Sequence, residues 1–197
     1  MPVDEATLVR RCLRGEAEGI RILVERFQTE IFGLCVRLLG HRHEAEDVTQ
    51  EVFLRIFRSL RRWDPARPLK PWIMSIAVNR CRTVLAQRSR RPELVDYLQD
   101  TAAGPAVDDT AELLAEIHEA LATLRLEYRT VFVLFHEQGQ SYDLIAATLD
   151  CPVGTIKTWL HRARLHVLER LRQRGMIPTD EPEPDTMPPT GAPPKRG

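Results

Sequence analysis

The 197-residue sequence is 43% hydrophobic and 28% charged, which is ordinary for a soluble globular protein of one or two small domains. No apolar stretch approaches the about 20 residues of a membrane-spanning helix, and the acidic N-terminus is unlike a secretory signal, so we expect a cytoplasmic protein. The 28 basic and 28 acidic residues cancel, but they are strongly segregated along the chain.

The first part of the chain is predicted to be helical, with one long loop. Apolar residues recur at steps of three and four, the spacing of one helix face. Helices are expected at about residues 4–14, 20–39, 44–60 and 72–91. Three prolines in WDPARPLKP, residues 63–71, predict a loop before the last of these helices.

The second part is predicted to be helical as well. Helices are expected at about residues 110–124, 128–136 and 142–149, and from about residue 153 onward. Strand patterning is weak throughout, and VFVLF, residues 131–135, could be a strand but has no partner strand. We therefore expect an all-α protein of two small helical domains, the second with a helix-turn-helix.

Composition sets the expected domain boundaries. Glycine, proline and acidic residues with little periodicity predict an acidic flexible linker at residues 92–110. The domains are then expected at residues 1–91 and 111–174. Residues 175–197 hold seven of the fourteen prolines and are predicted to be a disordered tail.

Charge alternates between blocks of the sequence. Residues 41–54 carry four acids and one base, residues 55–91 carry eleven bases and one acid, and residues 92–127 carry nine acids and one base. Residues 153–174 are basic again, with six bases and one acid. Two basic blocks separated by an acidic one predict two contacts with polyanions, although solvated helix faces of random charge are the simpler alternative.

The stretch CPVGTIKTWLHRAR follows a short helix for which Ser141 is a suitable N-cap. Residues 150–152 leave room only for a turn, and the next helix is apolar on its inner face and basic outside, as in a helix-turn-helix that binds DNA. The outward residues suited to reach base edges and phosphates are Gly154, Thr155, Lys157, Thr158, His161 and Arg162. A membrane-surface helix or a coiled-coil helix fits this pattern less well.

The first domain combines an acidic helix face with a basic one. Asp47, Gln50 and Leu54 share one face by their spacing of three and four. Trp63 and Trp72 lie among the arginines that follow, and rings interleaved with cations suit single-stranded nucleic acid. The alternative is that both tryptophans belong to the core of a small helical domain.

Three stretches, EAEDVTQEVFLRIFRSL, PWIMSIAVNRCR and GQSYDLIAATLDCPVGTIKTWLHRAR, resemble bacterial RNA polymerase sigma factors of the extracytoplasmic-function (ECF) type, over roughly residues 10–174. The resemblance implies that the first domain docks on core polymerase and reads the melted −10 element, and that the second reads the −35 element in duplex DNA. The implied polymerase contacts are Glu46, Asp47, Gln50, Glu51 and Leu54. The implied −10 contacts are Arg61, Arg62, Trp63, Lys70, Trp72, Asn79 and Arg80. The implied −35 contacts are the six outward residues of the helix-turn-helix named above.

The partners implied by the resemblance are core RNA polymerase, through its β′ clamp and β subunits, promoter DNA, and an anti-sigma factor that holds the chain inactive. No cofactor, metal or enzymatic activity is expected, and the four cysteines are expected to be reduced thiols. Two other hypotheses stay open: a stand-alone helix-turn-helix regulator, and a nucleic-acid enzyme with a metal held by Glu44, Asp47 and Glu51.

Overall fold

The computed structural model describes residues 4–90 and 109–178, and every regular element in these ranges is a helix, which confirms the all-α class. The first part contains α1 (Glu5–Leu13), α2 (Ala17–Leu39), α3 (Arg42–Ser59), the 3₁₀ turn η1 (Leu60–Arg62) and α4 (Leu69–Arg90). The second part contains α5 (Asp109–Ala122), α6 (Leu126–Phe132), the π-helical turn η3 (Val133–Glu137), α7 (Tyr142–Leu149) and α8 (Val153–Gln173).

The expected helix faces account for most of the first core. Along α2, the side chains of Leu23, Phe27, Ile31 and Leu34 are buried at steps of three and four. The helix ends at Gly40, whose φ of 74° lies in the left-handed region that glycine adopts without strain.

The predicted loop at residues 63–71 is too long, because α4 already begins at Leu69. Pro71 lies in the first turn of α4, where a backbone N–H has no partner inside the helix and proline is therefore tolerated. The N–H of Leu69, at the start of the same helix, donates to Oε2 of Glu5 in α1 at 2.8 Å. Because proline is also tolerated at a helix start, the loop was predicted to end three residues too late.

Residues 131–135 are helical, which confirms the helix predicted over 128–136 and not the strand alternative. Helix α6 runs without a break into the π-helical turn η3. Residues 109 and 110, predicted to be linker, already belong to α5. The rest of the predicted linker, and the predicted tail beyond residue 178, lie outside the described residues.

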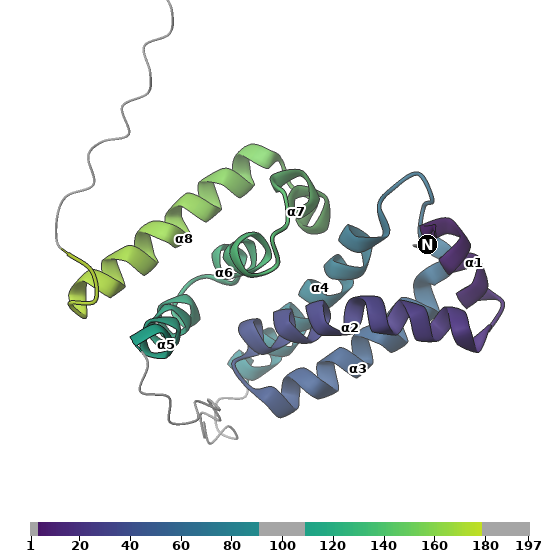
Figure 1. Ribbon diagram of the computed structural model, residues 1–197, viewed down its shortest axis with the longest axis horizontal. Coiled ribbons are helices and arrows are strands. Elements are labelled where there is room, and N and C mark those ends of the chain that lie inside the picture. Colours follow the sequence, from purple (N-terminus) through teal and green to yellow (C-terminus); the bar gives the residue numbers. More distant parts are fainter. Residues whose placement is uncertain (1–3, 91–108, 179–197) are drawn as a thin grey trace, which may run out of the picture.

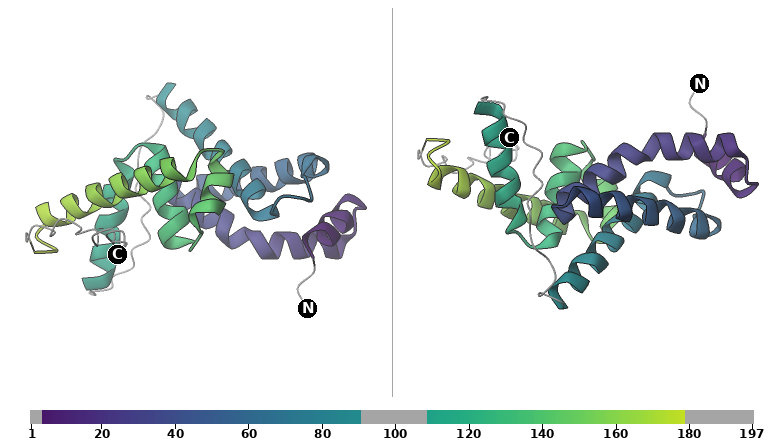
Figure 2. Two further views of the ribbon diagram at one scale, coloured as in Figure 1. Left: turned by 90° about the horizontal axis from the view of Figure 1, so that it is seen from above. Right: turned by 90° about the horizontal axis from the view of Figure 1, so that it is seen from below.

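The two halves of the chain pack against each other. In Figure 1, α1 to α4 form one bundle and α5 to α8 the other. Helix α7 packs on α4 and α6 packs on α2, while α5 and α8 extend away from the first bundle (Figure 2). Buried residues of both bundles belong to one continuous hydrophobic cluster, so the halves are not merely tethered.

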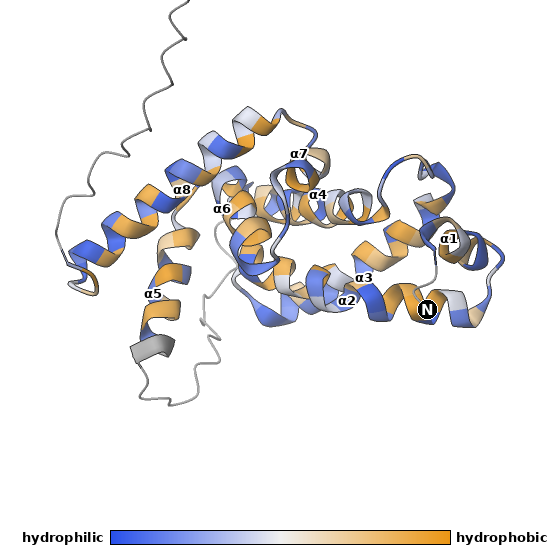
Figure 3. Ribbon diagram, turned by 45° about the horizontal axis from the view of Figure 1, so that its top comes forward, coloured by the Kyte–Doolittle hydropathy of each residue, from blue (hydrophilic) through white to orange (hydrophobic). Residues whose placement is uncertain are grey.

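Helices α5 and α8 have a small core of their own. Ala120 and Leu121 of α5 are buried against Val167 and Leu171 of α8. Figure 3 shows hydrophobic and hydrophilic residues alternating along both helices, as expected for helices with one buried face. The N-terminal half of α8 packs instead on α6 and α7, which leaves its opposite face outward.

Candidate nucleic-acid and protein interfaces

The predicted helix-turn-helix is formed by α7 and α8. The Ser141 side chain caps α7 by accepting from the N–H of Leu144 at 3.3 Å. Asp150 ends α7 in the left-handed conformation, with φ of 50°, and Pro152 is the N-cap of α8. The inner stripe expected for the second helix is buried in full: Ile156, Leu160, Ala163, Val167 and Leu171.

The outer face of α8 near its start is open to solvent. Gly154, Lys157, Thr158, His161 and Arg162 are exposed, and Thr155 is partly buried. The Thr158 hydroxyl donates to the Gly154 carbonyl oxygen at 2.9 Å, which leaves its oxygen free to accept. Short hydroxyls beside a lysine and an arginine suit both phosphates and base edges.

One aromatic side chain beside this face, Tyr128, was missed by the sequence analysis. Arg162 Nη1 donates to the Tyr128 hydroxyl at 2.9 Å, and this hydrogen bond holds the pKa of Tyr128 below its ordinary value. The ring of Tyr128 lies 6.3 Å from that of Trp159. Tyr128 precedes the helix-turn-helix in sequence, so only the packing of α6 on α8 reveals its place.

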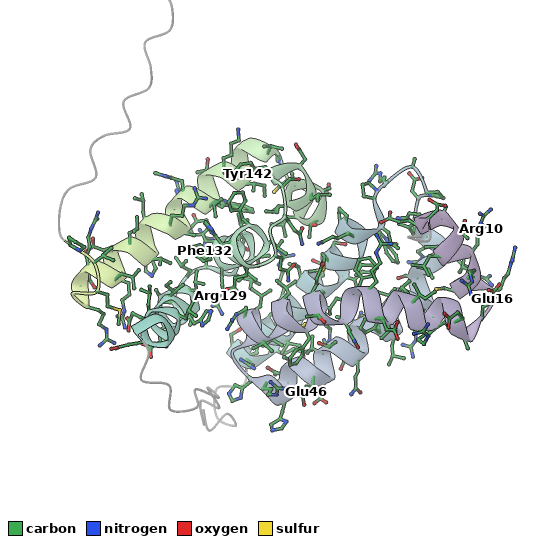
Figure 4. All side chains as sticks on the ribbon, viewed as in Figure 1. Arg10, Glu16, Glu46, Arg129, Phe132 and Tyr142 are labelled. Atoms are coloured by element: carbon green, nitrogen blue, oxygen red, sulfur yellow. The ribbon has the colours of Figure 1, made fainter. Side chains whose placement is uncertain are left out.

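The acidic face of α3 points away from the core. Asp47, Gln50 and Leu54 are exposed, and Leu54 keeps 55% of its surface accessible. Figure 4 shows Glu46 on the side of α3 that faces away from the second half of the chain. An exposed leucine beside a carboxylate and an amide leaves an apolar contact with polar neighbours available to a partner protein.

Two acidic residues of α3 are partnered by arginines of α4. Glu51 forms an ion pair with Arg80, and Glu44 forms one with Arg88. Within residues 4–90 and 109–178, no three histidine, cysteine or acidic side chains are grouped so that they could hold a metal ion. The arrangement of Glu44, Asp47 and Glu51 therefore gives no support to the hypothesis of a metal-dependent enzyme.

A hollow of about 690 Å³ lies beside the two tryptophans, and we call it the tryptophan hollow. From the first half it is lined by Arg62, Trp63, Asp64, Arg67, Pro68, Pro71, Trp72, Ser75, Val78, Asn79 and Arg82, and from the second half by residues 147–150. Four of the seven predicted −10 residues thus meet at one place. Arg67, Ser75 and Arg82 were missed, although their basic and polar types suit the same ligand.

The two tryptophans differ in exposure. Trp63 is only 7% exposed and belongs to the core, whereas Trp72 is partly exposed. The buried Nε1 of Trp63 has no hydrogen-bond acceptor. Trp72 therefore offers the more accessible ring for stacking, whereas Trp63 is a core residue that also lines the hollow.

The remaining predicted −10 residues lie elsewhere. Lys70 forms an ion pair with Glu30 of α2, with Nζ and Oε2 2.8 Å apart. Arg61 is exposed outside the tryptophan hollow. Arg80 lines a second hollow of about 610 Å³ between α3 and α4, where Arg55 and Arg58 add positive charge.

The cysteines are free thiols, and three of the four are buried. Cys35 of α2 and Cys81 of α4 bring their sulfur atoms to 3.7 Å in the first core. The hydrogen bond that Cys81 donates raises its own pKa and lowers the pKa of Cys35. None of the described helices is long and apolar enough to cross a membrane.

Comparison with known proteins identifies both halves. Residues 23–91 match the family model for Sigma-70 region 2, and residues 114–167 match that for Sigma-70, region 4. RNA polymerase sigma-H factor of Pseudomonas aeruginosa is 32% identical over 174 residues, covering 82% of this chain and 90% of the relative. ECF RNA polymerase sigma factor SigW of Bacillus subtilis is 31% identical over 179 residues, covering 83% of this chain and 95% of the relative.

Two solved structures share the fold. CnrH, solved in complex with the cytosolic domain of CnrY, has a TM-score of 0.64 and 24% identity, covering 84% of this chain and 96% of that chain. The sigma factor RpoE of Bartonella quintana, solved with the anti-sigma factor NepR, has a TM-score of 0.65 and 24% identity, covering 77% of this chain and 96% of that chain. At this identity the likeness concerns the fold alone.

Proposed function

The chain belongs to the ECF group of bacterial RNA polymerase sigma factors, and we propose that three of its surfaces divide the work of promoter recognition. As a sigma factor it directs core RNA polymerase to promoters. The stand-alone regulator is not favoured, because region 2 and region 4 both occur in this chain.

The exposed face of α3 is the proposed polymerase-docking surface. The single observation that carries this assignment is Leu54, whose large side chain is 55% exposed while Asp47 and Gln50 share its face. Burying such a leucine in an interface is favourable, and the carboxylates beside it select a basic partner surface. Glu46 and Glu51 border this face, where Glu51 is also paired with Arg80.

The tryptophan hollow is the proposed site for the melted −10 element. Trp72 offers a ring on which an unpaired base can stack, and Asn79 can pair with a base edge. Arg62, Arg67 and Arg82 place positive charge around the hollow for the phosphates. Binding the bases out of the stack offsets the cost of melting, which is a few kcal/mol per step.

The outer face of α8 is the proposed −35 reader. Its exposed start carries Lys157, Thr158 and Arg162. The space beside the Cα atom of Gly154 is open, because no heavy atom lies within 4 Å of the position that a Cβ atom would take there. The backbone at Gly154 is therefore open to a phosphate of duplex DNA, whereas the N–H groups of Thr155 and Ile156 already donate to the Pro152 carbonyl oxygen.

The role is that of a specificity subunit. We propose that the chain performs no catalysis of its own, acts in the cytoplasm with the polymerase, and is held inactive by an anti-sigma protein. The last point is supported by the shared fold with RpoE of Bartonella quintana, which was solved with an anti-sigma factor.

Substituting Leu54 tests the docking surface. Leu54→Ala should weaken binding to core RNA polymerase by about 1–3 kcal/mol, or roughly 5- to 150-fold, because a central apolar contact is lost. The measurement is equilibrium binding of fluorescently labelled full-length protein to core enzyme. Leu13→Ala, at another exposed leucine, is the matched control. If both variants bind core enzyme with the affinity of wild type, the exposed face of α3 is not the polymerase-docking surface.

A further inference from the structure

We infer that Tyr128 of α6 is a positioning residue of the −35 reader, because its hydroxyl group holds the Arg162 guanidinium in the orientation that reads a base. The inference rests on the proposed −35 role of α8 and extends it to a helix outside the helix-turn-helix. It starts from one hydrogen bond at the exposed face of α8, in which Arg162 Nη1 donates to Tyr128 Oη at 2.9 Å.

The head group of Arg162 depends on Tyr128 for its position in the free protein. Arg162 is exposed, and within the part of the chain that the structure describes it forms no ion pair and no other hydrogen bond. An exposed arginine without a partner samples many rotamers, and ordering it on DNA costs side-chain entropy. The hydrogen bond to Tyr128 removes part of this cost before DNA binds.

Tyr128 is itself held in place by the packing of α6 on α8. Its side chain is partly buried, and its ring centroid lies 6.3 Å from that of Trp159, with the rings inclined at 49°. Trp159 precedes Arg162 by three residues, so the two side chains lie on the same side of α8. A tyrosine has only two side-chain torsions, so fixing the ring also fixes the hydroxyl group.

A second cation lies near the phenol oxygen. The hydrogen bond from Arg162 is the main reason that the pKa of Tyr128 is lowered, and the charge of Arg125, the N-cap residue of α6, acts in the same direction. The oxygen of Tyr128 therefore serves as an acceptor between two guanidinium groups. A phenylalanine would fill the same space but would offer no acceptor, so packing and positioning can be separated.

The hydrogen bond leaves Arg162 free to contact DNA. A guanidinium carries five N–H donors, and the phenol oxygen accepts from one Nη atom. The remaining donors can still form two parallel hydrogen bonds with a base edge. A planar fork in a fixed orientation suits a base edge, whose acceptors have fixed directions, whereas a phosphate accepts from many directions. Tyr128 is therefore expected to increase discrimination between base pairs more than general affinity for duplex DNA.

Tyr128→Phe in the full-length protein, assembled with core RNA polymerase, tests this role. The measurement is equilibrium binding to a set of −35 duplexes in which each base pair is changed in turn. We expect binding of the preferred duplex to weaken by about 3- to 10-fold, the net effect of one hydrogen bond. The loss should be confined to the base pair whose preference Arg162→Ala also relaxes. The dependence of affinity on salt should not change, because no phosphate contact is removed.

A double variant and a matched control make the test specific. In the Arg162→Ala background, Tyr128→Phe should have no further effect, because the hydroxyl group then has no guanidinium to position. Thr130→Val removes a hydroxyl group from the same helix, where it donates at 2.7 Å to the carbonyl oxygen of Leu126 within α6. This control should leave both the affinity and the base preference unchanged.

The other outcomes overturn either the inference or the role on which it rests. Equal weakening by Tyr128→Phe across all duplexes, or a loss that adds to that of Arg162→Ala, would make Tyr128 a packing residue only. Unchanged binding by Tyr128→Phe, when Arg162→Ala weakens binding, overturns the inference and leaves the −35 reader intact. If Arg162→Ala changes neither affinity nor base preference, the −35 role of Arg162 fails, and the inference fails with it.

Discussion

Trp63 and Trp72 lie nine residues apart and contribute in different ways. Trp63 is buried in the first core, whereas Trp72 keeps part of its ring accessible in the tryptophan hollow. Trp63→Ala should lower the free energy of unfolding by about 3–5 kcal/mol, measured by chemical denaturation, because it leaves a large cavity.

Trp72→Ala should instead reduce promoter melting. Base–aromatic stacking is worth about 1–3 kcal/mol per base, so open-complex formation should fall by about 5- to 150-fold. Permanganate reactivity of unpaired −10 thymines in the polymerase complex measures this directly. Unchanged reactivity would contradict stacking on Trp72.

Arg162 links the −35 reader to Tyr128. Arg162→Ala should weaken binding of the polymerase complex to a −35 duplex by about 1–3 kcal/mol. The pKa of Tyr128 should rise toward its ordinary value, because the hydrogen bond from Arg162 holds it down. Duplex-binding titrations and absorbance titration of the phenol check the two effects. Arg172→Ala, near the far end of α8, is the control that should leave both unchanged.

For single residues, the sequence indicated which residue types form a site better than it indicated their burial and their partners. Charge and ring content pointed to the segment that lines the tryptophan hollow, but they favoured Trp72 over Trp63 as the core residue, whereas the structure buries Trp63. Lys70 was predicted to contact DNA, yet Glu30 of α2 already pairs with it. Such a partner, 40 residues earlier in the chain, leaves no local pattern.

At the scale of elements, α5 and α8 are joined by an acid held between two arginines. Glu116 Oε1 accepts from Arg170 Nε at 2.6 Å and from Arg174 Nε at 3.1 Å. The hydrogen bond from Arg170 is the main reason that the pKa of Glu116 lies below its ordinary value. The folded carboxyl group is thus more acidic than the unfolded one.

This difference sets the direction of a pH effect. The stabilisation is fully present above the ordinary glutamate pKa and is lost as the pH falls through the lowered pKa. We expect amide hydrogen exchange in α5 and the end of α8 to accelerate in acid. Glu116→Gln should show faster exchange already at neutral pH and a smaller acid response, whereas the exposed Glu119→Gln should resemble wild type. An identical acid response in Glu116→Gln would contradict the assignment.

Helices with apolar residues at regular steps of three and four could be predicted from the sequence. The residues at which these helices begin and end were predicted less accurately. All five inner residues expected for α8 are buried, because steps of three and four define one helix face whatever it packs against. The start of α4 was placed three residues late, since proline is compatible both with a loop and with the first turn of a helix. The π-helical turn η3 has no sequence signal that we recognise.

At the scale of the whole molecule, the contact between the two bundles lies beyond sequence reasoning. Arg129 and Gln138 donate across the two bundles to backbone carbonyl oxygens, of Leu38 and Glu30, and every residue type supplies such an acceptor. The apolar faces of α4 and α7 were expected to be buried, but their periodicity does not say against which partner. Pattern and charge predicted two helical domains, whereas the packing of one bundle against the other was seen only in the structure.

As a sigma factor, this chain confers promoter specificity on core RNA polymerase. The most direct measurement is in vitro transcription from a pool of random promoter sequences with purified core enzyme, with and without the full-length protein. We expect transcripts only with the protein, from templates that share a −35 and a −10 motif, and fewer of them with Leu54→Ala. Tight duplex binding by the chain alone, with no protein-dependent transcripts and no binding to core enzyme, would contradict the account.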